Sequence, residues 1–293
     1  MPELPEIQTI LDGLRRFILN KPISRFEIID KKIAIKVSDL DKIKGDVFSD
    51  ASRLGKLLYF SFSKNEKKLL IHLKMTGQLI FCSKDSSDKA VLAGGHSDKK
   101  SPKINCADLK YIRFKVLFKD GSILVLNDAR RFAYVRLADR EQFSEVKARF
   151  GLEPLDKKDL TYPRFLKLIE KRGRKNIKAF LLDQSLIAGI GNIYADEILF
   201  ASKINPLRKV SDLNKGERRL VFNNIYKILK LAVEKKGTTF SDYVDAEGRS
   251  GGFLKLLKVY GRDGESCYKC SGVIKKVKVA GRGTHYCPKC QKN

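Results

Sequence analysis

Tryptophan is absent from the 293-residue sequence, and no apolar run approaches the roughly 18 residues that a membrane-spanning helix needs. Acidic residues are also scarce, because 34 Asp and Glu face 60 Lys and Arg and leave a formal net charge of +26. Such an excess of cations attracts polyanions, so the composition favours a nucleic-acid partner without separating DNA from RNA. The first ten residues are neither basic nor continuously apolar. We therefore expect no signal peptide, no membrane partner and a cytoplasmic protein.

The hydrophobic pattern changes near residue 140. Short strand-like runs dominate the part before it, at 57–62, 69–81, 111–118, 122–126 and 132–137, behind a helix that starts with Pro5. Helical spacing dominates the part after it, at 141–150, 162–172, 177–187, 193–201 and 215–236. A β-rich first half and a helical second half predict two domains. The polar segments 83–103 and 245–252 predict a flexible insertion and a mobile loop.

Four of the six cysteines lie near the end of the sequence in two C-x2-C pairs separated by 16 residues. Four thiolates at this spacing close a tetrahedral shell around zinc, and a shell without an open position is structural rather than catalytic. One structural Zn²⁺ is therefore expected, and its binding energy would help to fold a module too small for its own core. Cys82 and Cys106 stand apart and are predicted to be free thiols, since a cytoplasmic chain has little use for disulfides. The predicted ligands are Cys267, Cys270, Cys287 and Cys290.

A β-hairpin is predicted between the two cysteine pairs. Residues 273–280 alternate as a strand does, and the run ends at Gly281-Arg282-Gly283. An arginine at the tip of such a hairpin suits a nucleic-acid groove or a phosphate. A solvated loop arginine fits the pattern equally well.

The N-terminus combines Pro2 with Glu3 and Glu6 at the start of a helix. A small residue in the second position permits removal of Met1. This would leave the secondary amine of Pro2 at the end of a short, rigid segment. An α-amino group with a pKa near ~7.7–8 supplies neutral nucleophile, and it can form an iminium with a sugar carbon. By spacing alone, however, ordinary helix initiation explains these residues better, with Pro in the first turn and acids at the positive helix end.

Five motifs in separate parts of the sequence favour a catalytic N-terminus over ordinary helix initiation. They are MPELPE at 1–6, HLKMTG at 72–77, NDARRF at 127–132, GIGNIYADE at 189–197 and the terminal four-cysteine finger. In this order they resemble the bacterial formamidopyrimidine-DNA glycosylase family over essentially the whole chain, most weakly at 83–107. The resemblance implies an α+β multidomain protein. Its expected parts are an N-terminal β-sandwich with flanking helices (1–138), a helix-two-turn-helix domain (139–257) and a C-terminal β-hairpin zinc finger (258–293).

The resemblance implies catalytic roles for five residues. Pro2 matches the Schiff-base nucleophile, and Glu3 matches the proton donor of base excision and sugar opening. Glu6 matches a second acid near the active centre. Lys56, in RLGKLLYF, matches a lysine that contacts the phosphate beside the lesion and assists β-elimination. Arg282 matches the finger arginine of phosphate binding and δ-elimination.

Further residues are implied to contact DNA. Met75, Arg130 and Phe132 match the side chains that fill the gap left by a flipped nucleotide, although Met75 and Phe132 alone would indicate core. Asn192, after two glycines that open a helix, matches a phosphate-binding asparagine. Residues 103–106 depart from the His-containing sequence of many relatives, so one contact is expected to be missing or replaced. The remaining implied contacts are His72, Arg174 and Lys178.

These residues imply a bifunctional DNA glycosylase and abasic-site lyase that excises oxidised purines such as 8-oxoguanine and formamidopyrimidines. The implied partner is damaged double-stranded DNA, and the implied state is a monomer in the bacterial cytoplasm, at the nucleoid. One alternative is the sister group that excises oxidised pyrimidines, which tends to start with a Gly where this chain has Leu4 and lacks the set matched by Met75, Arg130 and Phe132. Another is a non-catalytic zinc-finger protein that binds nucleic acid. It explains the charge and the cysteines but gives no reason for PELPE or Lys56.

Overall fold

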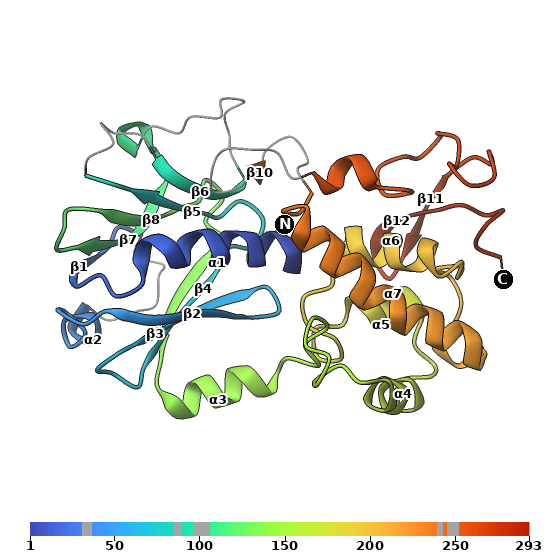
Figure 1. Cartoon of the computed structure of the whole chain (residues 1–293), viewed down its shortest axis with the longest axis horizontal. Coiled ribbons are helices and arrows are strands. Elements are labelled where there is room, and N and C mark those ends of the chain that lie inside the picture. Colours follow the sequence, from blue (N-terminus) through green and yellow to red (C-terminus); the bar gives the residue numbers. More distant parts are fainter. Residues whose placement is uncertain (31–36, 85–89, 97–105, 239–242, 245–251, 293) are drawn as a thin grey trace. The chain divides into compact units, whose positions relative to one another are not determined.

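Figure 1 shows the protein as a computed structural model, which describes the chain except for residues 31–36, 85–89, 97–105, 239–242, 245–251 and 293. The described residues form two compact units, Met1–Ala148 with Lys235–Leu254, and Arg149–Glu234 with Lys255–Asn293. The predicted loop 245–252 lies almost wholly outside the described residues, as does most of the departure at 103–106. The predicted boundaries after residues 138 and 257 stay a prediction.

Two antiparallel sheets form the first unit, with strand orders β1-β7-β8-β5-β6-β10 and β2-β3-β4-β9. Leu69 and Ile71 of β4 share one core with Leu79 and Phe81 of β5, and the apolar face of α1 packs against the same core. The predicted N-terminal β-sandwich with flanking helices is thus confirmed. The elements are α1 (Leu4–Ile18), β1 (Ile23–Ile28), α2 (Val37–Asp41), β2 (Phe48–Leu54), β3 (Leu57–Phe62), β4 (Lys68–His72), β5 (Gln78–Cys82), β6 (Ala90–His96), η1 (Cys106–Asp108), β7 (Ile112–Phe118), β8 (Ile123–Asn127), β9 (Tyr134–Ala138), α3 (Arg140–Ala148) and β10 (Tyr243–Val244).

The predicted run 69–81 is two strands, β4 and β5, separated by a tight turn at 73–77. Lys74 adopts a φ of 51°, and the Gly77 amide donates to the Leu73 carbonyl at 2.9 Å. A Cβ on Gly77 would lie 2.5 Å from that carbonyl oxygen, so the turn requires glycine. The turn presents Met75, whose side chain is 44% exposed rather than part of the core.

Cys82 and Cys106 form a disulfide, so the prediction of two free thiols is wrong. Their Cα atoms lie 6.3 Å apart although 24 residues separate them in the sequence. The bond packs with Ile80 and Val125 in a small apolar cluster on the β5–β8 face. Local sequence gives no sign of this pairing, because only the sheet brings the end of β5 to η1. Part of the predicted insertion 83–103 is also strand β6, which pairs with β5.

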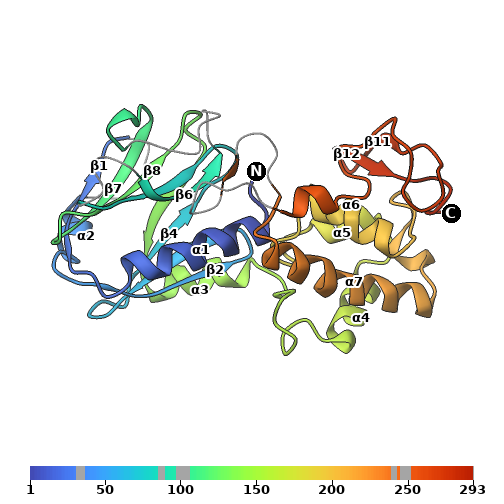
Figure 2. The same ribbon diagram turned by 45° about the horizontal axis from the view of Figure 1, so that its top comes forward.

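Helices dominate the second unit, as the sequence predicts. The 20-residue α7 buries Val221, Ile225, Leu229 and Ala232 along one face. Figures 1 and 2 show α7 between α4 on one side and α6 with the β11–β12 hairpin on the other. No helix in the described ranges is long and apolar enough to cross a membrane. The elements are α4 (Tyr162–Lys171), α5 (Ile177–Leu182), α6 (Asn192–Ala201), η2 (Val210–Asp212), α7 (Lys215–Glu234), β11 (Lys275–Val279) and β12 (Arg282–Tyr286), with η3 (Phe253–Leu256) where the two units join in sequence.

The disulfide predicts a specific labelling pattern. Protein unfolded in guanidinium without reductant should react with N-ethylmaleimide at the four finger cysteines, because Cys82 and Cys106 lack a thiol. Prior treatment with dithiothreitol should add these two sites. Peptide mass spectrometry distinguishes the cases, and labelling of Cys82 and Cys106 before reduction would contradict the structure.

Candidate functional site

The start of the chain is held by the buried carboxylate of Glu6. One of its oxygens accepts a hydrogen bond from the Glu3 backbone N–H at 2.9 Å. The other accepts from the backbone N–H and the hydroxyl of Thr238, at 2.8 and 3.1 Å. Glu3 and Glu6 are only 4% and 3% exposed. Glu6 therefore fixes the residues just before α1 and ties them to a segment more than 200 positions away in sequence.

Gly237 shapes the approach of that distant segment. It adopts a φ of +79°, and a Cβ there would lie 2.6 Å from the Glu6 carboxylate oxygen. Any side chain would push the segment off Glu6, so glycine is needed for both its conformation and its small size.

Charged side chains surround the chain terminus. Burial lowers the pKa of the Met1 α-amine below its usual 8.0. Lys56 and Arg130 lower that pKa further, whereas Glu3 and Glu6 raise it. Lys56 is itself only 6% exposed. The predicted catalytic residues of the first unit thus lie around the chain start, in surroundings that favour an uncharged amine.

His72 closes the turn that carries Met75. Its Nδ1 accepts a hydrogen bond from the Lys74 backbone N–H at 2.9 Å. Burial lowers the pKa of His72 to about 3, and the charges of Lys74 and Lys56 act in the same direction. The imidazole is therefore neutral near pH 7, with Nδ1 as acceptor and Nε2–H as donor. His72 offers a hydrogen-bond donor rather than a charge.

Asp128, which sequence reasoning did not single out, connects two loops. This fully buried carboxylate accepts from the backbone N–H groups of Arg130, Phe132 and Ala133, at 3.2, 2.8 and 2.7 Å. It also accepts from the hydroxyl of Thr76 in the neighbouring turn. An Asp that heads a turn and bonds the amides after it is a known pattern, and this was the available signal.

The two connected loops present the three predicted gap-filling side chains. Met75 and Phe132 are 44% and 54% exposed, although apolar residues of this size are usually buried. The Arg130 guanidinium carbon lies 5.7 Å from the centre of the Phe132 ring. The structure therefore exposes two apolar side chains and one cation on two loops that Asp128 connects.

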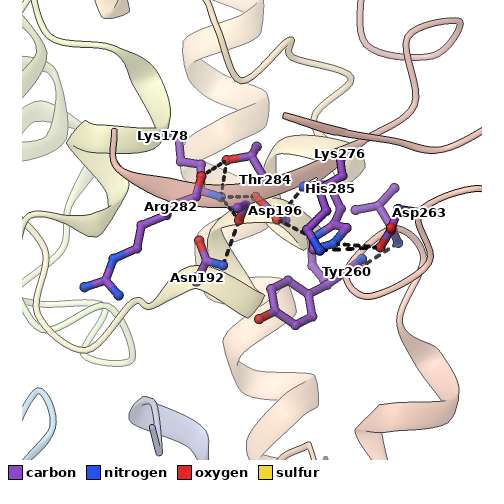
Figure 3. A network of polar contacts seen from close by, with 12 residues as sticks. Lys178, Asn192, Asp196, Tyr260, Asp263, Lys276, Arg282, Thr284 and His285 are labelled. Atoms are coloured by element: carbon purple, nitrogen blue, oxygen red, sulfur yellow. Dashed lines mark hydrogen bonds and ion pairs between the residues drawn. The ribbon is translucent and has the colours of Figure 1, made fainter. Parts of the chain in front are cut away.

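In the second unit, the N-terminus of α6 meets the tip of the zinc-finger hairpin. The side-chain amide of Asn192 donates to the Gly283 carbonyl at 2.9 Å (Figure 3). Ala280 and Gly281 form the hairpin turn with φ values of 50° and 74°, which matches the twist of two-residue hairpins. Arg282 follows directly and is exposed, and Figure 3 shows it pointing away from the polar contacts behind it.

Lys178, predicted to contact DNA, lies fully buried behind that hairpin. Its ammonium pairs with Asp196 at 2.7 Å and donates to the Thr284 hydroxyl at 2.7 Å and the Gly283 carbonyl at 3.2 Å. Asp196 also accepts the His285 backbone N–H at 2.9 Å. Because these bonds use the ammonium within the protein, Lys178 is placed to fix α5 and α6 to the hairpin (Figure 3) rather than to face a ligand.

Glu197, beside Asp196 on α6, holds the chain that leads into the finger. One of its oxygens accepts the backbone N–H groups of Lys258, Val259 and Tyr260 at 2.9–3.0 Å. Burial raises the pKa of Glu197, while these three bonds oppose the rise. Two neighbouring acids of α6 thus hold two parts of the finger region. Asp196 holds strand β12, and Glu197 holds the chain at 258–260.

Arg174 occupies the turn between α4 and α5 and is exposed. The turn is closed by the Lys175 N–H, which bonds the Arg172 carbonyl at 2.8 Å, and Lys175 pairs with Asp183. The predicted DNA contact at Arg174 is therefore on the surface, on a fixed turn.

The four finger cysteines are arranged for one tetrahedral metal ion. Their sulfur atoms all lie within 4.8 Å of one another, and two of the separations are 3.9 and 3.4 Å. Sulfurs at about 2.3 Å from a tetrahedral zinc are about 3.8 Å apart, so the four thiols fit this ion. With all four positions taken by sulfur the zinc is structural, as predicted from the spacing. The cluster is Cys267, Cys270, Cys287 and Cys290.

Family models match almost the entire chain. The formamidopyrimidine-DNA glycosylase N-terminal domain matches residues 1–135, and the formamidopyrimidine-DNA glycosylase H2TH domain matches 150–244. A zinc finger found in FPG and IleRS matches 264–293. The structure indicates the same class of protein. It combines a β-sandwich, a helical unit, a four-cysteine finger and buried acidic residues at the start of the chain. The chain belongs to the formamidopyrimidine-DNA glycosylase family.

Individual relatives agree with this assignment. Formamidopyrimidine-DNA glycosylase of Carboxydothermus hydrogenoformans is 40% identical over 93% of both chains, and that of Mycoplasma pneumoniae is 37% identical over 92% of both. Among solved structures, Lactococcus lactis Fpg with DNA containing an abasic site has a TM-score of 0.82 at 30% identity, covering 99% of this chain and 100% of the other. The wild-type L. lactis Fpg with N7-benzyl-Fapy-dG DNA gives 0.83 at 30% identity, with full coverage of both chains.

Replacing His72 should reduce the acid sensitivity of the fold. The folded pKa is about 3 against an ordinary 6.5, so the unfolded chain binds the extra proton between these values. The stabilisation from the neutral imidazole is complete above pH 6.5 and is lost as the pH falls toward 3. His72→Asn keeps an acceptor for the Lys74 amide but does not titrate. Urea unfolding measures the free energy of unfolding at pH 7 and at pH 5. The decrease between these two pH values should be smaller in His72→Asn than in the wild type, by up to about 2 kcal/mol. An equal decrease in both proteins would contradict the conclusion that His72 is buried as a neutral imidazole.

Removing the charge of Asp128 should loosen both connected loops. Asn at this position has one oxygen in place of two and directs an N–H₂ group at the amides of Phe132 and Ala133. We expect Asp128→Asn to lower the unfolding free energy by about 2–4 kcal/mol and to speed hydrogen exchange at 130–133. Asp139→Asn is the matched control, because Asp139 is exposed and its carboxylate accepts from the Gln142 backbone N–H at the start of its own helix. Unchanged exchange at 130–133 would show that the carboxylate does not hold the loop.

Proposed function

We propose that this protein is a bifunctional DNA glycosylase and abasic-site lyase that removes oxidised purines, including 8-oxoguanine and formamidopyrimidines, from duplex DNA. The observation that carries the proposal is the chain start, where Glu3, Glu6 and Lys56 are buried around a terminal amine whose pKa is lowered. A helix-initiating Pro-Glu pair has no need of these partners. The names of the relatives and their structures with damaged DNA support the same reaction.

Pro2 is the proposed nucleophile. Its nitrogen is an amide while Met1 is attached, so removal of Met1 is required. The free amine attacks C1′ of the damaged nucleotide, and a C1′–N bond forms while the bond to the base breaks. Glu3 supplies the proton for base loss and for opening of the sugar ring, which leaves an iminium. Loss of a C2′ proton then expels the 3′ phosphate, and a second elimination expels the 5′ phosphate, so a one-nucleotide gap remains.

The other predicted residues hold the DNA in this proposal. Met75, Arg130 and Phe132 enter the duplex where the damaged nucleotide has left the stack, which their exposure favours. Lys56 assists the elimination steps beside the lesion phosphate. Asn192 lies at a helix N-terminus, which favours phosphate.

The remaining proposed contacts differ in how directly they act. Arg282 and Arg174 are exposed cations suited to phosphates. His72 donates from Nε2 without carrying charge. Glu6 and Lys178 act through the segments that they fix, because their polar atoms bond neighbouring backbone and side chains. The cytoplasmic location and the monomeric state stay predictions.

An excision assay tests the choice of purines over pyrimidines. The exposed Met75, Arg130 and Phe132 set favours oxidised purines, because the sister group for oxidised pyrimidines lacks it. Duplexes carrying 8-oxoguanine or thymine glycol at one position should be cut with a clear preference for 8-oxoguanine. Preference for thymine glycol would assign the protein to the sister group.

Borohydride trapping tests the nucleophile. Reduction of the iminium should attach wild-type protein covalently to 8-oxoguanine DNA, whereas Pro2→Gly should lose most of the trapped product, about tenfold or more, because it replaces the secondary amine. Pro5→Ala is the matched control, since it changes a proline of the same turn and keeps the terminal amine. Intact mass measurement establishes Met1 removal in each sample. A processed wild-type protein that cannot be trapped would favour the non-catalytic zinc-finger alternative.

A further inference from the structure

A cavity of about 390 Å³ lies in the second unit, between α7 and the segment 154–162, which leads into α4. Its walls include Pro154, Leu160, Tyr162, Phe222 and Tyr226, so the interior is largely apolar and aromatic. A volume of this size is within the range of ligand pockets and is enough to seat one large side chain. None of the proposed catalytic or DNA-contacting residues lines it.

The aromatic walls are held by neighbouring rings. Tyr162 meets Phe222 edge-on with ring centres 5.2 Å apart. Phe165, fully buried, lies 5.6 Å from Phe222 and supports it from behind. Because the rings pack on each other, they fix the wall of the cavity that α4 and α7 supply, and the segment 154–161 before α4 supplies the rest.

Two cations stack on tyrosines that line the cavity. The Arg219 guanidinium carbon lies 3.4 Å from the centre of the Tyr162 ring. The Lys157 ammonium, which also lines the cavity, lies 4.8 Å from the centre of the Tyr226 ring. Both side chains are exposed. A stacked cation keeps its outer side available for an anion, so each of these two lining tyrosines holds a positive charge beside it.

The charge around the cavity is positive overall. Lys158 and Lys227 are exposed beside the lining residues Lys157 and Tyr226 in the sequence. Of the nearby acids, Asp159 is paired with Arg164, and one oxygen of Asp156 accepts the Lys158 backbone N–H. An occupant with several carboxylates would therefore complement the rim, while an apolar side chain would fill the interior.

The cavity also lies away from two of the proposed DNA contacts of its own unit, Asn192 and Arg282. In Figures 1 and 2, α7 separates α4 from α6 and the hairpin that carries Arg282. An occupant at α4 would thus leave the N-terminus of α6 and the finger accessible.

We propose that this cavity binds a short acidic peptide segment of a partner protein, with one aromatic or large aliphatic residue as its anchor. The anchor enters the space among Leu160, Phe222 and Tyr226, and carboxylates on either side pair with Arg219 and Lys157. Single-stranded DNA is the other polyanion to consider. Bases bind by stacking on open ring faces, whereas a cation already covers one face of Tyr162 and one face of Tyr226. The covered faces favour the peptide.

Fluorescence anisotropy with the full chain tests the site. The probe is a labelled peptide of about ten residues, rich in Asp and Glu with one Phe, and its partners are a Phe→Ala peptide and a peptide with Asn and Gln for the acids. Both changes should weaken binding at least about tenfold, because either the cavity or the rim loses its complement. Since the protein is unchanged in these comparisons, misfolding does not affect the result.

Variants then locate the binding. Arg219→Ala should weaken binding of the labelled peptide by about tenfold. Lys230→Ala, which removes a cation of the same helix that pairs with Glu234, should bind as the wild type does. Both variants should retain DNA excision, so failure of this site is distinguishable from failure of the proposed activity. Equal loss in both variants, no dependence on Phe, or displacement by a short single-stranded oligonucleotide at equal concentration would overturn the proposal.

Discussion

Buried carboxylates are the interaction on which the working parts of this protein depend. A carboxylate removed from water is costly unless hydrogen-bond donors surround it, so it fixes whatever segments supply those donors. Glu6 takes donors from Glu3 and Thr238, and Asp128 takes them from Thr76 and the loop after it. Asp196 takes them from Lys178 and the finger strand β12. In each case one acid joins two segments that are distant in sequence.

This arrangement explains how exposed groups are placed reliably. Met75 and Phe132 stand on loops and Arg282 directly follows a hairpin turn, and such connections are the parts of a fold most open to motion. The backbone of each turn, however, is bonded directly or through a neighbour to a buried acid. A site built from turns needs such support, because small displacements of contacting groups cost much of their effect. At the other end of the finger, zinc takes this role, because its four cysteine ligands join two segments of the chain.

Sequence reasoning identified the parts whose signal is local. The zinc ligands, the hairpin with Arg282, the helix behind Pro5 and strand β3 all follow from spacing or periodicity. Three features depend on distant contacts and were not visible. The disulfide of Cys82 and Cys106 forms because a sheet brings together residues far apart in sequence. Neither the link from Asp128 to Thr76 nor the burial of Lys178 follows from neighbouring residues, since each depends on where another element packs. The turn at 73–77 was predicted as strand because its apolar alternation continues across it.

The central claim is that the α-amine of Pro2 becomes bonded to the damaged sugar, and mapping the linkage tests it most directly. Protein trapped on 8-oxoguanine DNA with borohydride would be digested with trypsin and nuclease, and the modified peptide sequenced by tandem mass spectrometry. We predict the sugar remnant on the N-terminal peptide, at the Pro2 nitrogen and without Met1. A remnant on Lys56 or on any other lysine would contradict the account.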